Sequence, residues 1–151
     1  MRRVLLLCVF AAACVDNPSE PTLDVDFEGY EQQVHPYVEV ACGTLDCHGD
    51  EGRPLRLYGE FGLRLEDRDS PISAFEYEEN AYSLRGVGDD SLILLKPLSE
   101  AAGGLHHVGG DVWPDEQDPG YRCLHGWLVG DAEMIEACPL AAAAVAVPAE
   151  D

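Results

Sequence analysis

The run Cys42–His48 holds the residues of this chain with the most distinctive chemistry. Two thiols, Cys42 and Cys47, stand four residues apart, and His48 follows the second one directly. Thiols in this order can add to the two vinyl groups of a porphyrin, and the imidazole then lies beneath the iron as the proximal ligand. The usual spacing has two residues between the cysteines, but Gly43 lets the longer loop bulge while its ends stay in place. The run therefore predicts covalent attachment of haem c through Cys42 and Cys47, with His48 as an axial ligand of the iron.

A six-coordinate haem iron needs a second axial ligand, which is normally histidine or methionine. His106 and His107 lie between two glycine pairs, and glycine lets the backbone come close to the flat face of a porphyrin. The histidine pair therefore supplies the predicted distal ligand, with Met134 as the alternative. These residues also have ordinary interpretations, a surface loop for the two histidines and a buried apolar side chain for the methionine.

Helical patterns surround the cysteine motif. Apolar residues at helical spacing predict a helix over 27–41, with Asp26 as its N-cap, running straight into the motif. Pro36 is expected to interrupt or restart this helix and to push His35 toward an extended conformation. The sequence favours a mainly α domain.

The remainder of the chain mixes loops with helices. Residues 49–90 are rich in charge and glycine, which predicts mostly loops with short helices or strand fragments. The apolar run 91–97, stopped by a proline, predicts a short buried helix. The clearest helix begins at 118–120, with a cap and a proline at its first position, and ends at Gly130. The alanine-rich segment 139–151 is expected to be a tail.

The first residues have the pattern of an export signal. Residues 1–13 combine two arginines, an apolar stretch and three alanines, which is typical of a signal peptide. Cys14 follows the alanines as in a bacterial lipobox, so it is the predicted lipidation site, and residues 14–26 form a linker to a domain over 27–138. Val15 stands where an aspartate would signal retention in the inner membrane. The protein is thus expected in the bacterial cell envelope, anchored to the outer membrane and facing the periplasm or the surface.

Two further cysteines, Cys123 and Cys138, form an even pair. In an oxidising compartment such a pair is expected to form a disulfide. Closing a loop of this length stabilises a fold by roughly 3 kcal/mol.

The charge of the chain limits its partners. It contains 9 Lys and Arg and 29 Asp and Glu, which gives a net charge of −20. Such a chain does not bind nucleic acid through a basic face, and it suits a protein partner with a basic docking face. No G-x-S-x-G, H-E-x-x-H or phosphate-binding motif occurs, so an enzyme is not expected.

The motifs together resemble a cytochrome c-like domain of bacterial envelope lipoproteins, of the type seen in myxobacteria and planctomycetes. The resemblance covers residues 27–131 and rests on four runs: Cys42, Cys47, His48 and Gly49; Ser91–Lys96; His107–Gly110; and Asp118–Tyr121 with Trp127–Gly130. It implies a small helical domain with long loops, a membrane-anchored carrier of single electrons, and His107 rather than His106 as distal ligand. It also implies that the final helix, ending in W-L-V-G, packs near the haem.

Two other interpretations stay open. Cys42, Cys47 and His48 could bind zinc with one more histidine, although adjacent ligands are awkward for a tetrahedral site. Alternatively, Cys42 and Cys47 could pair in a small disulfide ring. The chain would then be a haem-free, disulfide-stabilised envelope lipoprotein that acts as a binding or assembly module.

Overall fold

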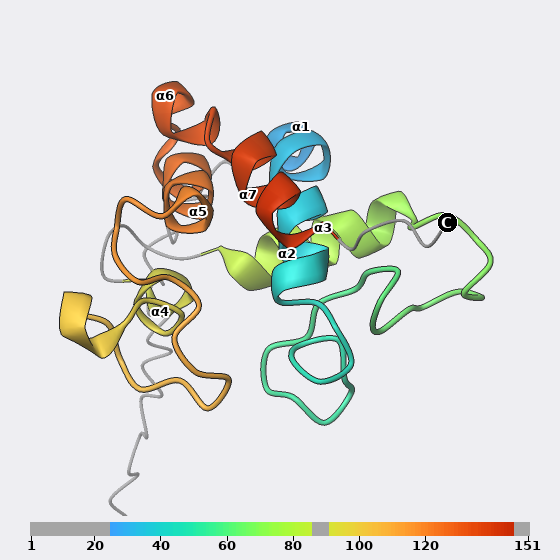
Figure 1. Ribbon diagram of the computed structural model, residues 1–151. Helices are drawn as coiled ribbons and strands as arrows, with labels where there is room; N and C mark the ends of the chain where they lie inside the picture. Colours follow the sequence, from blue (N-terminus) through green and yellow to red (C-terminus); the bar gives the residue numbers. More distant parts are fainter. Residues whose placement is uncertain (1–24, 86–90, 147–151) are drawn as a thin grey trace, which may run out of the picture.

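The computed structural model describes residues 25–85 and 91–146, which form a small, mainly α domain (Figure 1). The predicted signal peptide, the lipidation site Cys14 and most of the linker lie outside these residues. In chain order the elements are α1 (Phe27–Gly29), the π-helix η1 (Tyr30–Val34), α2 (His35–Ala41), α3 (Ala74–Leu84), α4 (Leu92–Leu95), the 3-10 helix η3 (Glu100–Ala102), α5 (Pro119–Val129), α6 (Ala132–Ile135) and α7 (Cys138–Val145).

The extended backbone within these ranges pairs only at isolated bridges, Tyr58 with Leu63 and Leu98 with Trp113. None of the described helices has the length and apolar character needed to cross a bilayer.

The first helical segment continues past Pro36, but a new α-helix, α2, starts at His35 with the proline in its first turn, as expected of a proline that restarts a helix. Asp26 caps the start of the segment by accepting a hydrogen bond from Gly29 N, as the sequence predicts. The prediction of an extended His35 is wrong, because its φ of −55° and ψ of −43° are helical. The turn before the proline is a π-helix, in which His35 N donates to Tyr30 O. This wider turn accommodates a residue that lacks an N–H and that would clash with a carbonyl in a regular helix.

The first and last helical segments pack on each other to form the core. Trp127 of α5 lies against Tyr30, with ring centres 5.4 Å apart, and its indole N–H donates to Asp26 O at 2.9 Å. α7 lies against both α2 and α5 (Figure 1). The predicted disulfide is present and joins Cys123 of α5 to Cys138 of α7. This core fixes the direction in which α2 delivers the chain to Cys42.

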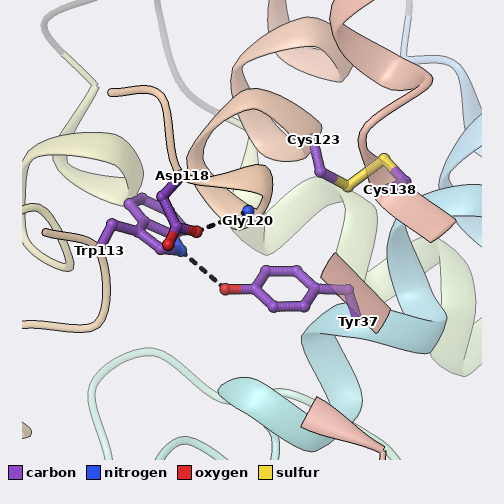
Figure 2. The surroundings of a disulfide bond; sticks show 6 residues. All are labelled: Tyr37, Trp113, Asp118, Gly120, Cys123 and Cys138. Atoms are coloured by element: carbon purple, nitrogen blue, oxygen red, sulfur yellow. Dashed lines mark hydrogen bonds between the residues drawn. A yellow bond between two sulfur atoms is a disulfide. The ribbon is translucent and has the colours of Figure 1, made fainter. Parts of the chain in front are cut away.

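A buried hydrogen bond joins α2 to the segment before α5. The indole Nε1 of Trp113, a fully buried residue, donates to the hydroxyl of Tyr37 at 2.7 Å (Figure 2). Gly120 lies against this pair, and a Cβ there would collide with both the Tyr37 hydroxyl and Trp113 Nε1. Asp118 caps α5 by accepting from Gly120 N at 2.8 Å, as predicted. Only glycine lets the first turn of α5 come this close.

An eleven-residue helix, α3, occupies a segment predicted to consist mostly of loops. Ser73 and Glu76 form a capping box at its start. A serine followed three residues later by a glutamate is the sequence signal for such a helix start. The acidic composition of the helix had obscured its pattern.

The C-terminal segment is also more ordered than its composition predicts. α7 continues through Val145, and Ala141 is buried, so residues 139–145 are helix rather than tail. Met134 lies on α6 between α5 and α7. Gly130 ends α5 with a positive φ of 71°, which confirms the predicted C-terminal stop.

Candidate functional site

The cysteine–histidine run forms a closed turn at the end of α2. His48 N donates to Cys42 O at 2.8 Å, and Cys47 N donates to Thr44 O at 2.9 Å. Gly43, at the start of the turn, donates its N–H to Val38 O of the last turn of α2 at 2.9 Å. The two additional residues between the cysteines are therefore accommodated as a bulge, while the two ends of the run are joined by a hydrogen bond.

A second loop supports this turn from behind. Gly49 and Gly62 cross at close range, and a Cβ on either would collide with the carbonyl oxygen of Gly43. Leu45 N also donates to Phe61 O at 3.2 Å. The position of the cysteine–histidine turn thus depends on the loop over residues 58–65.

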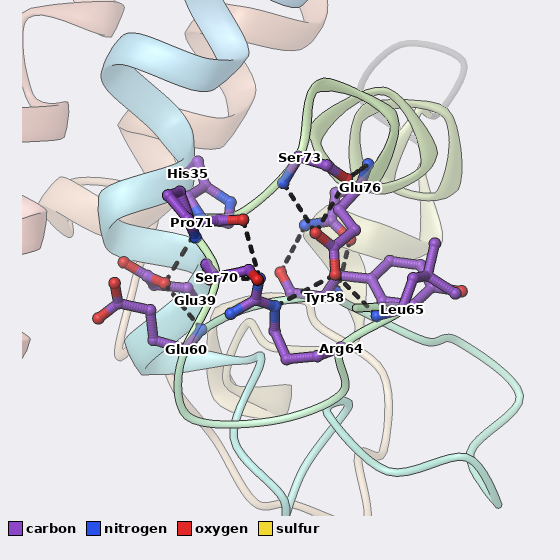
Figure 3. Close-up of polar contacts among 11 residues, drawn as sticks. His35, Glu39, Tyr58, Glu60, Arg64, Leu65, Ser70, Pro71, Ser73 and Glu76 are labelled. Carbon is purple, nitrogen blue, oxygen red and sulfur yellow. Dashed lines mark hydrogen bonds and ion pairs between the residues drawn. The ribbon is translucent and has the colours of Figure 1, made fainter. Parts of the chain in front are cut away.

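Two buried polar side chains of α3 hold that loop in place (Figure 3). Asn80 accepts from Tyr58 N and donates to Tyr58 O, both at 2.7 Å. Glu76 accepts from Leu65 N at 2.8 Å and forms an ion pair with Arg64 at 3.2 Å. The missed helix is therefore the support on which the candidate site is built.

The carboxyl group of Glu76 is held in its ionised form. Burial by itself raises its pKa, but hydrogen bonds from the N–H groups of Ser73 and Leu65 and from the side chains of Arg64 and Ser73 outweigh this effect. The net result lowers the pKa of Glu76 to about 2. Hydrogen bonds to the charged form favour that form, so this support is strongest at neutral pH.

A cavity of about 830 Å³ opens beside the cysteine–histidine turn. Its walls come from the segment 46–55, the end of α3 at 83–85, the α4 region at 91–97 and the histidine loop at 106–109. Leucine, isoleucine, valine and proline side chains make up much of the lining. The volume falls within the range of about 300–1,000 Å³ that is typical of small-molecule and cofactor sites.

Two imidazole rings face the cavity from opposite loops. The rings of His48 and His107 are nearly parallel, with an interplanar angle of 11°, and their centres lie 6.0 Å apart. A metal-bound imidazole nitrogen lies about 2 Å from the metal, so two imidazoles that share one metal have ring centres a little more than about 6 Å apart. The distance between the two ring centres is therefore close to that of two imidazoles that share one metal.

The outer nitrogen of each ring is already engaged. His48 Nδ1 lies 3.2 Å from Leu55 O, and His107 Nδ1 lies 3.0 Å from Gly110 O. A carbonyl can only accept, so each Nδ1 carries a proton and donates it to the carbonyl oxygen. Metal-binding histidines are commonly fixed in this way by a hydrogen bond from the other ring nitrogen.

The surroundings of His48 favour its neutral form. Burial lowers the pKa of His48; the hydrogen bond to Leu55 O opposes this effect, and the nearby His107 and Arg53 lower the pKa further. A histidine binds metal as the neutral imidazole, so this direction favours ligation at neutral pH.

The other predicted ligands are placed less well. His106 also lines the cavity, but its side chain is 81% exposed and its Nδ1 lies 3.3 Å from the Glu100 carboxylate. Met134 is not part of the cavity wall. Trp127 and the rest of α5 are also absent from the wall, so the final helix packs on η1 instead of on the cavity. Of the three candidates for the distal ligand, His107 combines a place on the cavity wall with a ring parallel to that of His48.

The two cysteines of the motif differ in their surroundings. Both are free thiols and both are partly buried. Cys47 lines the cavity, whereas Cys42 packs against the hydrophobic core and is not part of the wall. Burial, and to a lesser degree the neighbouring Cys47, raises the pKa of the Cys42 thiol to about 12. Cys47 is therefore the better placed of the two to react with a molecule in the cavity.

The zinc interpretation finds no matching cluster. Across residues 25–85 and 91–146, no group of three or more His, Cys, Asp or Glu side chains is arranged to hold a metal ion. The pair His48 and His107 offers two imidazole rings beside one cavity, which is fewer protein ligands than a structural zinc site uses.

Comparison of the chain with known protein families, with curated protein sequences and with solved structures gave no match. The site is therefore interpreted from its own geometry.

Three cations of the cavity wall, Arg53, Arg85 and Lys96, were missed in the sequence. They come from three separate segments and form no motif. The sequence offers one general indication: only 9 of the 151 residues are lysine or arginine, so each cation stands out in an acidic chain.

Proposed function

We propose that the chain is a c-type haem protein that carries single electrons in the bacterial cell envelope. The observation that supports this most directly is the pair of parallel imidazoles, His48 and His107, whose spacing of 6.0 Å across the cavity fits one iron between them. A haem c bound there would supply a one-electron couple between ferric and ferrous iron.

The residues of the chain have defined roles in this proposal. Cys47 and Cys42 provide the thiols for attachment, with Cys47 on the cavity wall. His48 and His107 would hold the iron, and their Nδ1 atoms are engaged with backbone carbonyls. Two protein ligands leave the iron no open position, so the proposed role is electron transfer and not catalysis. The apolar wall limits access of water and so contributes to the reduction potential.

The proposal also includes a place in the cell and a class of partner. Cys14 would carry the lipid that anchors the chain to the outer membrane, and residues 14–26 would form the linker to the domain. The domain would face the periplasm or the cell surface. With a net charge of −20, the chain suits a redox partner that presents a basic face.

The test is to produce the full chain in a periplasm equipped for cytochrome c maturation and then to denature it. We expect haem to stay on the polypeptide, and the native ferric protein to show the spectrum of low-spin iron with two histidine ligands. His107→Ala should change this spectrum, whereas the matched variant His106→Ala should not.

Three results would contradict the proposal. One is a Cys42–Cys47 disulfide in protein purified from its own host, which would support the haem-free binding module. Another is stoichiometric zinc in place of haem. The third is an unchanged low-spin spectrum in His107→Ala, which would remove the proposed distal ligand.

A further inference from the structure

The charge of the cavity wall is opposite to that of the chain. The whole chain contains 29 acidic residues and 9 lysines and arginines. Among the residues that the structure describes, in contrast, the wall contains three cations, Arg53, Arg85 and Lys96, and one acidic residue, Asp46. A third of the cations of a strongly acidic chain thus gather around one cavity. Such an arrangement attracts an anionic molecule.

Two of these cations are held in position by neutral groups. Arg53 Nη2 donates to Asp46 O at 2.9 Å, and Lys96 Nζ donates to His106 O at 2.8 Å. These backbone carbonyls orient the side chains without neutralising them. Arginine has five N–H donors and lysine three, so each retains donors for a ligand.

None of the three forms an ion pair with a carboxylate among the residues that the structure describes. Arg64 provides the contrast, since it is paired with Glu76 away from the cavity. The chain therefore uses a carboxylate where an arginine has a structural role and leaves the cations of the cavity available.

The three cations also come from different segments of the cavity wall. Arg53 follows the cysteine–histidine turn, Arg85 is the C-cap of α3, and Lys96 is the C-cap of α4. Between them the lining is largely apolar, with Leu55, Leu84 and Ile93 among its members. A ligand that fits both features has an apolar body and carboxylate groups at its edge.

We propose that Arg53, Arg85 and Lys96 form a carboxylate-binding subsite that recognises and orients the cavity ligand through its acidic side chains. This inference rests on the proposed function, in which the ligand is a haem and the carboxylates are its two propionates. The subsite fixes which edge of the ring faces the cations, and so which vinyl edge faces Cys47.

The inference is tested with two porphyrins that differ only in charge. The full chain, purified without cofactor, is titrated with ferric protoporphyrin IX and with its dimethyl ester in the same detergent buffer, followed by absorbance. The ester lacks the two negative charges that the cations would pair with, so we expect it to bind about tenfold more weakly.

Matched variants assign this preference to the cavity. Arg53→Gln/Lys96→Gln should reduce the preference for the free acid, whereas Arg56→Gln/Arg68→Gln removes the same charge from exposed positions outside the wall and should not. In covalently loaded protein, the cavity variant should also have a lower reduction potential than the control variant, because fewer nearby cations favour the ferric form.

Two results would overturn the subsite and leave the proposed function intact. One is equal binding of the free acid and the ester by the unchanged chain. The other is an equal loss of the preference for the free acid in both double variants. If neither porphyrin binds and no covalent haem is found after maturation, the proposed function itself is overturned.

Discussion

Replacement of Glu76 by glutamine tests how the site is supported. Glu76 is fully buried and holds the loop over 58–65, on which the cysteine–histidine turn packs. Its pKa falls from an ordinary 4.5 to about 2 in the folded protein. This difference corresponds to about 3 kcal/mol of stability at neutral pH, since one pH unit is worth about 1.4 kcal/mol.

The sign of the pH dependence follows from the direction of the shift. A depressed pKa gives stability that is present above about 4.5 and lost as the pH falls toward 2. At pH 3 about 2 kcal/mol of the contribution is gone and about 1 kcal/mol remains. Glu76→Gln should therefore be destabilised by about 3 kcal/mol at pH 7, and this deficit should shrink to about 1 kcal/mol at pH 3.

The assay is urea unfolding followed by far-ultraviolet circular dichroism at both pH values. Glu78→Gln is the matched control, because Glu78 is exposed on the same helix and undergoes the same loss of charge. A deficit of Glu76→Gln relative to this control that stays constant between pH 7 and pH 3, or that is below about 1 kcal/mol at pH 7, would refute the reasoning.

Three further variants probe the core and the attachment site. Replacing both Cys123 and Cys138 by serine should lower the free energy of unfolding by about 3 kcal/mol in urea titrations, because the loop between them is no longer closed in the unfolded chain. Gly120→Ala should lower stability by about 1–3 kcal/mol in thermal melts, because the new methyl group meets the buried tyrosine–tryptophan pair. Cys47→Ser should lose more covalently retained haem than Cys42→Ser, measured on the denatured polypeptide, because only Cys47 lines the cavity.

Elements with local signals were predictable from the sequence. Asp26 and Asp118 cap their helices as expected, and Gly130 ends α5 in the left-handed conformation. The disulfide between Cys123 and Cys138 is also present, as cysteine counting predicts. The caps and the helix stop depend on residues within a few positions of each other. The disulfide was predictable because each of its cysteines had one expected partner.

Features that depend on distant contacts were not predictable in this way. The π-turn that admits Pro36 follows from packing around η1 and has no residue signature. Likewise, two neighbouring histidines cannot be told apart by spacing, whereas the structure places the ring of His107 parallel to that of His48. The unequal environments of Cys42 and Cys47 arise from the way the turn leaves α2, which the motif alone does not encode.

The capping box of α3 is an intermediate case. Its Ser73 and Glu76 stand at the expected spacing, but the segment is so acidic that it resembles a solvated loop. What the sequence could not show is that Glu76 serves twice, as a cap for its own helix and as the acceptor for Leu65 N.

The burial of Cys42 has a consequence for how the chain matures. In the proposed function, Cys123 and Cys138 become oxidised while Cys42 and Cys47 stay reduced for haem attachment, and both pairs pass through the same compartment. Exchange between thiols and disulfides needs a thiolate. A sulfur packed in the core, with its pKa raised to about 12, forms almost none. Once α2 has packed, Cys42 is therefore shielded from scrambling with the bond between Cys123 and Cys138, and the order in which the helices assemble governs which sulfurs find each other.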